Sequence, residues 1–300
     1  MPLLLATTDA DGFPLFLLGG LFVASFAAFQ MARQGGWLVP PKLVSDDPPP
    51  LPLRGREVLL VFVLFIISMG IAGSILRSAL GLDIDSLTSG TKIAPSDQTT
   101  LVWVEAGACL LALSSSCMLL QLLHGRDGVE LGFGWDRWRT DVIAGLLTAG
   151  LLAAPVLALM AIVVQFWESH HPLVDVMKTS ESASFLVAAT FSAVLVAPLW
   201  EEFLFRGVFQ SWLLRVEPQW IAVSGRSALP LGWMPNVVAS ALFALMHMDH
   251  GPDPIPLFFL SLGLGYLYHR TRRIYASWTA HAAFNAVSVA QLWLEHFAKG

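Results

Sequence analysis

Long apolar segments recur along the chain and are separated by shorter polar stretches. A helix needs about 20 mostly apolar residues to cross the hydrocarbon core of a bilayer. The pattern predicts spans near residues 13–32, 58–79, 101–123, 141–166, 186–214, 235–249, 255–268 and 274–294. The sixth and seventh are short, so the sequence defines their ends least well. We therefore predict an all-α fold, a polytopic transmembrane bundle of about eight helices.

Basic residues gather in alternate loops of this layout. The loops at 33–57, 124–140, 215–234 and 269–273 hold 12 Lys and Arg residues, and the opposite side holds three. Cytoplasmic loops are enriched in Lys and Arg, so the first group is predicted to be cytoplasmic and both termini outside. The first 32 residues contain no Lys or Arg, so we expect the first span to stay in the mature protein. The plasma or inner membrane is the expected location.

The composition agrees with a membrane bundle. Only 13% of the residues are charged and 55% are hydrophobic, whereas a soluble domain carries about 25% charge. A soluble globular protein and a disordered chain are therefore excluded. The net charge of −5 argues against a nucleic acid partner. Cys109 and Cys117 share one apolar segment and offer no metal-ligand spacing, so we interpret them as unreactive buried thiols.

Ionisable side chains within a membrane are costly and usually functional. Four of them lie near span ends, where they can reach the interface or cap a helix: Arg77, Glu105, Asp141 and Glu168. Six polar residues remain inside apolar segments of the last third of the chain: Glu201, Glu202, Arg206, His247, His281 and Asn285. Their concentration in three predicted helices indicates a catalytic site.

Helical geometry predicts different tasks for the two adjacent carboxylates. At about 100° per residue, Glu202 and Arg206 share a face and can form an ion pair. Glu201 points about 100° away, so it is left to face a cavity as a general base. At about 1.5 Å rise per residue, the polar residues reach a common depth in the membrane interior only if the fifth helix is long. Pro198 is expected to kink this helix and free a backbone carbonyl near the site.

The ordered motifs resemble the CPBP family, the Abi or CAAX-protease-like intramembrane endopeptidases. The resemblance rests on three motifs: E-E-x-x-x-R at 201–206, F-x-x-x-H at 243–247 and H-x-x-x-N at 281–285. Pro198 before the acid pair and Gly207 after the arginine also look like this family. The resemblance covers roughly residues 183–295. It implies that residues 183–295 form the catalytic core. The apolar and proline pattern divides the rest of the chain into residues 1–57, a first span with a proline-rich cytoplasmic linker, and residues 58–182, helices of unassigned role.

The resemblance implies hydrolysis of a peptide bond by a glutamate-activated water. In this interpretation Glu201 activates the water with help from His247, while Glu202 and Arg206 hold geometry and charge. The remaining two residues, His281 and Asn285, would donate hydrogen bonds to the oxyanion of the tetrahedral intermediate. The substrate would be a hydrophobic or lipidated membrane-associated peptide, with CAAX-type C-terminal processing as one form of the reaction.

Three alternatives stay open at this point. No cofactor is predicted, but Glu201, His247 and His281 form a reasonable zinc ligand set with an open fourth position, and zinc would run the same reaction. A non-proteolytic membrane scaffold or bacteriocin-immunity-type protein would bind a peptide or another membrane protein, and its function would not depend on Glu201 and His247. A proton-coupled transporter could use a Glu–His relay, although the chain shows no internal repeat that would support one.

Overall fold

The computed structural model describes residues 13–34, 52–81, 95–125, 129–167, 176–177, 180, 182–224 and 232–299. These residues are helical or form turns, with no strand among them, so the all-α prediction is confirmed for them. Most of the predicted proline-rich linker lies outside this part of the chain. In chain order the elements are α1 (Phe13–Gln34), α2 (Gly55–Leu80), α4 (Pro95–His124), η2 (Val129–Phe133), α5 (Trp138–Val163), α7 (Ala183–Phe191), η3 (Ser192–Val196), α8 (Ala197–Glu202), η4 (Phe203–Gln210), α9 (Ser211–Ser224), α10 (Trp233–Leu245), η5 (Met248–His250), α11 (Pro254–Thr271) and α12 (Ile274–Lys299).

Four helices of the described chain are long and apolar enough to cross a membrane. They cover Gly55–Ala79, Ser96–His124, Trp138–Val163 and Ala183–Val223, and they overlap the second to fifth predicted spans. A shorter apolar helix covers Trp233–Leu245. The chain is therefore an integral membrane protein. The total of eight spans remains a prediction.

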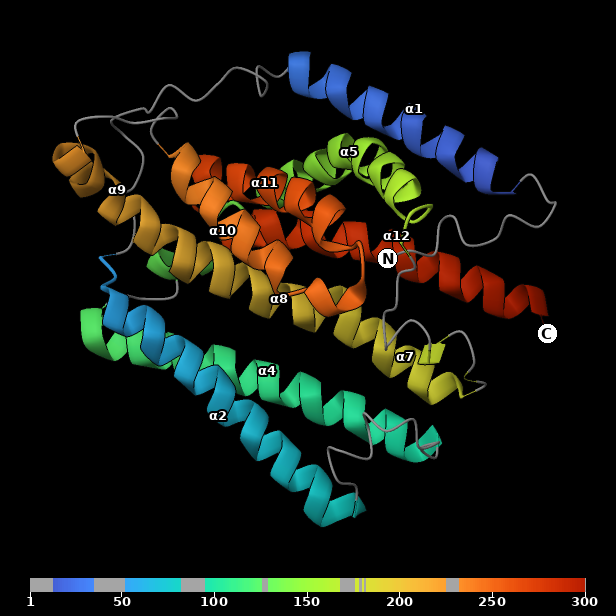
Figure 1. Cartoon of the computed structure of the whole chain (residues 1–300), viewed down its shortest axis with the longest axis horizontal. Coiled ribbons are helices and arrows are strands. Elements are labelled where there is room, and N and C mark those ends of the chain that lie inside the picture. The colour runs from blue at the N-terminus through green and yellow to red at the C-terminus, as the bar shows by residue number, and fades with distance from the viewer. Residues whose placement is uncertain are drawn as a thin grey trace.

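The fifth predicted span is one continuous helical stretch that runs from α7 to α9, as Figure 1 shows in yellow and gold. Its length confirms the prediction of a long fifth helix. Just before Pro198 the stretch changes from α-helical to π-helical hydrogen bonding. There the N–H of Ala197 donates to the carbonyl of Ser192, five residues back. The next carbonyl in this π-helical register belongs to Ala193 and would need the N–H of residue 198. Proline has no N–H, so the Ala193 carbonyl is released, as the sequence led us to expect.

The sixth helix is shorter than predicted, which corrects the placement of His247. Helix α10 ends at Leu245 instead of 249, so His247 lies just beyond the helix. The N–H of Met246 still bonds to the carbonyl of Leu242, but the N–H of His247 bonds to Ala244, only three residues back. The chain then turns at Gly251, whose φ of 79° suits glycine. The tighter turn ends the helix, although the apolar sequence continues through Met248.

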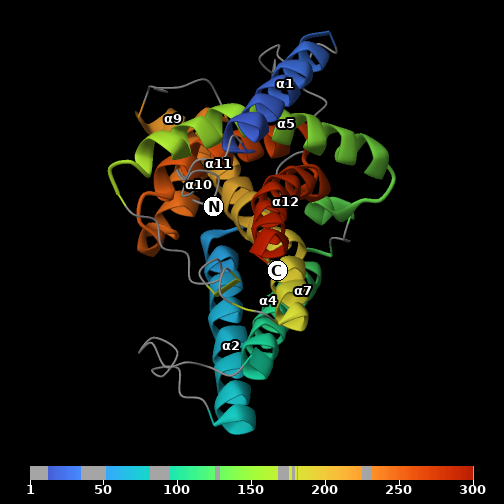
Figure 2. The ribbon, with the colours of Figure 1, turned by 90° about the vertical axis from the view of Figure 1, so that its right-hand side faces the viewer.

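Helices α12, α5, α11 and α10 form the larger part of the bundle, and α7–α9 runs through it (Figures 1 and 2). Helices α2 and α4 lie side by side and extend away from that part in both views. Phe65 of α2 stacks on Trp200 of α8 with ring centroids 5.0 Å apart, which joins the α2–α4 pair to the long helix. Helix α1 is held against α5 by the Ser25 hydroxyl, which accepts the N–H of Ala154 at 3.0 Å.

The four basic loops of the predicted topology meet at one end of the bundle. Arg215 donates to the carbonyl of Leu53 at 2.8 Å, and His124 lies 3.3 Å from the carboxylate of Glu57. The fourth loop joins the second, since Arg273 donates to Asp136 at 2.9 Å. This hydrogen bond lowers the pKa of Asp136, so the pair stays charged to a lower pH than a free aspartate would allow. The shared end agrees with the predicted alternation of loops, and its cytoplasmic orientation remains a prediction.

Close packing of α5 against α12 depends on Gly145. A Cβ atom at this position would lie 2.6 Å from Cβ of Thr279 and 2.7 Å from the carbonyl oxygen of Ala276. Because the second contact is with backbone, the two helices would have to separate. We expect Gly145→Ala to lower the free energy of unfolding by about 1–3 kcal/mol, measured by denaturant titration in detergent micelles.

Gly107 of α4 is the matched control for this substitution. It is also a glycine within a membrane-spanning helix, but nothing lies within 4 Å of a Cβ placed there. Gly107→Ala should therefore leave stability unchanged or raise it by about 1 kcal/mol, since alanine is the better helix former. Equal effects of the two substitutions would show that the α5–α12 contact does not limit stability.

Candidate active site

The centre of the site is an ion pair that is completely buried. Arg206 of η4 donates from Nε to Oε2 of Glu202 on α8 at 3.1 Å, and neither side chain has any exposed surface. This is the i,i+4 pair predicted from the sequence, and the structure confirms it. Two further groups surround the guanidinium: Nη2 donates to the Ser261 hydroxyl of α11 at 3.1 Å, and the Phe243 ring lies 5.4 Å away.

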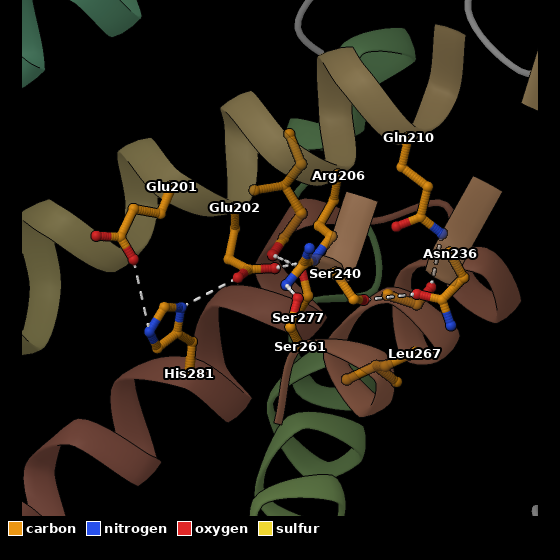
Figure 3. Close-up of polar contacts among 12 residues, drawn as sticks. Glu201, Glu202, Arg206, Gln210, Asn236, Ser240, Ser261, Leu267, Ser277 and His281 are labelled. Carbon is orange, nitrogen blue, oxygen red and sulfur yellow. Dashed lines mark hydrogen bonds and ion pairs between the residues drawn. The ribbon is translucent and has the colours of Figure 1, made fainter. Parts of the chain in front are cut away.

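His281 of α12 lies between the two carboxylates, as Figure 3 shows. Its Nδ1 is 3.0 Å from Oε1 of Glu202, and its Nε2 is 3.7 Å from Oε2 of Glu201. An ionised carboxylate only accepts hydrogen bonds, so Nδ1 donates to Glu202. The neutral imidazole then presents Nε2 as an acceptor toward Glu201, and the protonated imidazole presents it as a donor. The second carboxylate of the motif therefore fixes the tautomer and direction of His281.

The two carboxylates differ in their freedom to react. Both oxygens of Glu202 are engaged, one by Arg206 and the other by His281. The Glu201 side chain is 25% exposed, and its contact with His281 is longer than a hydrogen bond. Of the two carboxylates, Glu201 is thus the one that the protein does not enclose completely. This geometry agrees with the assignment of the base to Glu201.

His247 reaches the site through Phe243. The Phe243 ring is buried, with its centroid 4.9 Å from the His247 ring and 5.8 Å from the His281 ring. The Nδ1 atom of His247 is 2.8 Å from the carbonyl oxygen of Phe243. This contact holds the His247 imidazole beside the Phe243 ring, although His247 lies past the end of α10. The phenylalanine of the F-x-x-x-H motif therefore packs between Arg206 and the two histidines.

Asn285 is bonded to the backbone of the long helix. Its Nδ2 donates at 2.9 Å to the carbonyl of Ala193, the carbonyl that lacks a partner because residue 198 is proline. A side-chain amide has two N–H donors, so this bond leaves one for another acceptor. Asn285 lies one turn from His281 on the same helix, and its role as an oxyanion donor remains a prediction.

Sequence reasoning missed two hydroxyl groups of the site. Ser261 contacts Arg206 from α11, and the Ser277 hydroxyl of α12, which donates to the carbonyl of Ile274 at 3.2 Å, lies near Glu202. Both serines are fully buried. Ser277 precedes His281 by four residues and so shares its helical face, which is a signal that the sequence contains. Ser261 stands alone in an apolar segment, and only its packing against the long helix shows its partner.

Loss of the Ser261 hydroxyl should weaken the site without abolishing it. We expect Ser261→Ala to lower the free energy of unfolding by about 1–3 kcal/mol, because a buried charged donor loses its partner. Ser261→Thr keeps the hydroxyl and is the control. Thermal unfolding in micelles would measure both, and equal melting temperatures for Ser261→Ala and the wild type would contradict the prediction.

Among the described residues, no group of three or more His, Cys, Asp or Glu side chains is arranged to hold a metal ion. Glu201, His247 and His281, the zinc ligand set considered from the sequence, do not form such a group in this part of the chain. Metal independence of the reaction remains a prediction.

A comparison with known families finds one match. Residues 183–287 match the family model described as type II CAAX prenyl endopeptidase Rce1-like. The match confirms the resemblance to CAAX-protease-like endopeptidases, and it covers the long helix, α10, α11 and the part of α12 that carries the site. No curated protein and no solved structure matches the chain significantly.

Proposed function

We propose that the protein is an intramembrane endopeptidase in which Glu201 activates the attacking water. The observation that carries this proposal is the division between the two carboxylates. Glu202 is buried and held on both oxygens, whereas Glu201 is partly exposed beside the imidazole that Glu202 orients. A general base must come within hydrogen-bond reach of the proton that it takes, and of the two carboxylates only Glu201 has an oxygen that is not already bonded. The family match supports a protease.

The proposed reaction has two proton transfers. Glu201 takes a proton from water as the oxygen attacks the scissile carbonyl, with His247 assisting from the Phe243 side. Hydrogen bonds from His281 Nε2, in its protonated form, and from the second N–H of Asn285 stabilise the oxyanion. The intermediate collapses when the C–N bond breaks and the proton held by Glu201 moves to the leaving amine. The Glu202–Arg206 pair keeps its charges throughout.

The surroundings of the site support an apolar substrate. Three large hydrophobic side chains beside His247 are exposed: Leu245, Met246 and Met248. A hydrophobic or lipidated peptide would cover this surface while its scissile bond reaches Glu201. The description of the matching family, a CAAX prenyl endopeptidase, makes a prenylated C-terminal peptide the first substrate to try.

The proposal can be tested with purified protein in proteoliposomes. Prenylated CAAX peptides, the same peptides without the lipid, and unrelated transmembrane peptides would be offered to the wild type and to Glu201→Gln. Mass spectrometry would locate the cut. Cleavage by the wild type alone is expected, and it should survive chelation of metals. A chelator that abolishes cleavage would favour the zinc reaction, and absence of cleavage with retained peptide binding would favour a scaffold.

A further inference from the structure

One face of α12 carries three side chains that bond to the long helix. Trp278, His281 and Asn285 are spaced i, i+3 and i+7, so they lie in one row on the helix. The Trp278 indole N–H donates to the carbonyl of Leu195 at 2.9 Å. Asn285 donates to Ala193, so the two backbone bonds lie about one helical turn to either side of His281. They attach α12 to η3, the segment that precedes the acid pair.

The two acceptor carbonyls, of Ala193 and Leu195, lie in η3, an irregular part of the long helix. In a regular α-helix every interior carbonyl accepts an N–H from four residues ahead. The π-helical turn of η3 and the missing N–H of Pro198 disturb this ladder. The Ala193 carbonyl is therefore open to a donor from a neighbouring helix, and Asn285 of α12 supplies it. The Leu195 carbonyl accepts the N–H of Trp278 from the same helix. Pro198 thus leaves the Ala193 carbonyl free to bond with Asn285 of α12.

We propose that Trp278 is a positioning residue that fixes the rotation of α12 and so places His281 between the carboxylates; for catalysis this rests on the proposed function. The position of His281 between the two carboxylates tolerates little rotation of α12. His281 meets Glu202 at 3.0 Å and faces Glu201 at 3.7 Å, and a rotation by one residue, about 100°, would turn the imidazole away. Trp278 lies three residues before His281 on α12, less than one helical turn away. A rotation of the helix at Trp278 therefore also moves the imidazole of His281.

Directional hydrogen bonds add to van der Waals packing in setting this rotation. Small residues line the α12 face toward α5, including Ala276 and Thr279 beside Gly145, and small residues allow close approach of helices. A hydrogen bond from an indole N–H to a backbone carbonyl has a defined direction, and Trp278 provides one beside the catalytic histidine.

Replacing Trp278 by Phe tests the proposal, because the ring remains and the N–H donor is lost. We expect kcat to fall about 10- to 100-fold, the effect of a misplacement of about 1 Å, with KM changed by less than about twofold. Trp293→Phe is the matched control. Trp293 is also on α12 and donates from its indole N–H to the Thr190 hydroxyl at 2.9 Å, but it lies three turns from His281 and should keep the wild-type kcat.

A second readout does not depend on proteolysis. In protein labelled with ¹⁵N-histidine, the ring nitrogen signals of His281, assigned by their loss in His281→Asn, should shift in Trp278→Phe and stay in place in Trp293→Phe. If the wild type cleaves nothing, the proposed function fails and these shifts still decide the role of Trp278. Unchanged His281 signals together with unchanged kcat would overturn the proposal.

The phenylalanine variant is accepted only if its melting temperature in micelles stays close to that of the wild type. If it unfolds, benzothienylalanine at position 278 replaces it, since this residue keeps the bicyclic shape and lacks only the N–H. The same two readouts then apply. A wild-type kcat and wild-type His281 signals in that variant would show that the ring alone holds α12 in place.

Discussion

Glu201→Gln is expected to lower kcat by about 10²- to 10⁴-fold, the usual contribution of a general base, while KM changes little. The amide has nearly the shape of the carboxylate but cannot accept the proton of the attacking water. Because the Glu201 side chain is partly exposed, the folded structure should tolerate the change. Initial rates in proteoliposomes, measured over a range of substrate concentrations, would separate kcat from KM.

Glu217→Gln is the matched control for this experiment. Glu217 lies on the same continuous helix and is buried, with Oε2 accepting the N–H of Gly232 at 2.8 Å. A glutamine oxygen can accept the same bond, so this variant should keep its activity. Cleavage that persists in Glu201→Gln would refute the assignment of the base. Equal losses in both variants would point to a general effect of removing charge from the long helix.

Arg206→Met is expected to lower the free energy of unfolding by about 3–5 kcal/mol, the usual cost of removing one partner of a buried ion pair. Glu202 has no exposed surface, so its charge would remain without its main counter-ion. His281 bonds to the other oxygen, Oε1, so Oε2 would lose the partner that Arg206 provides. Denaturant titration in micelles, followed by tryptophan fluorescence, would measure the loss.

The double variant Glu202→Gln/Arg206→Met separates stability from catalysis. With both charges removed, no unpaired ion remains, and most of the lost stability should return. Cleavage should not return, because the group that orients His281 has changed from a carboxylate to an amide. A double variant as unstable as Arg206→Met alone would show that shape, and not the unpaired charge, caused the loss. Restored cleavage would show that the ion pair is not needed for the reaction.

The sequence by itself determined the features that repeat along single helices. Apolar length predicted the spans, and four of them are found as helices of suitable length and composition. Helical spacing predicted the Glu202–Arg206 pair, since two residues four apart share a face whatever surrounds them. The proline at 198 predicted a released carbonyl, since the lack of an N–H is a property of the residue. The three ordered motifs were enough to indicate the resemblance that the family model over residues 183–287 confirms.

The relations between helices were decided only by the tertiary structure. Spacing placed His281 and Asn285 on one face but did not show that His281 bridges both carboxylates or that Asn285 bonds to Ala193. The partner of Ser261 depended on packing of α11 against the long helix. The end of α10 at Leu245 depended on a turn that the apolar sequence conceals. Periodicity fixes positions around one helix axis, whereas the rotation and register of one helix against another follow from side-chain contacts between residues far apart in the chain.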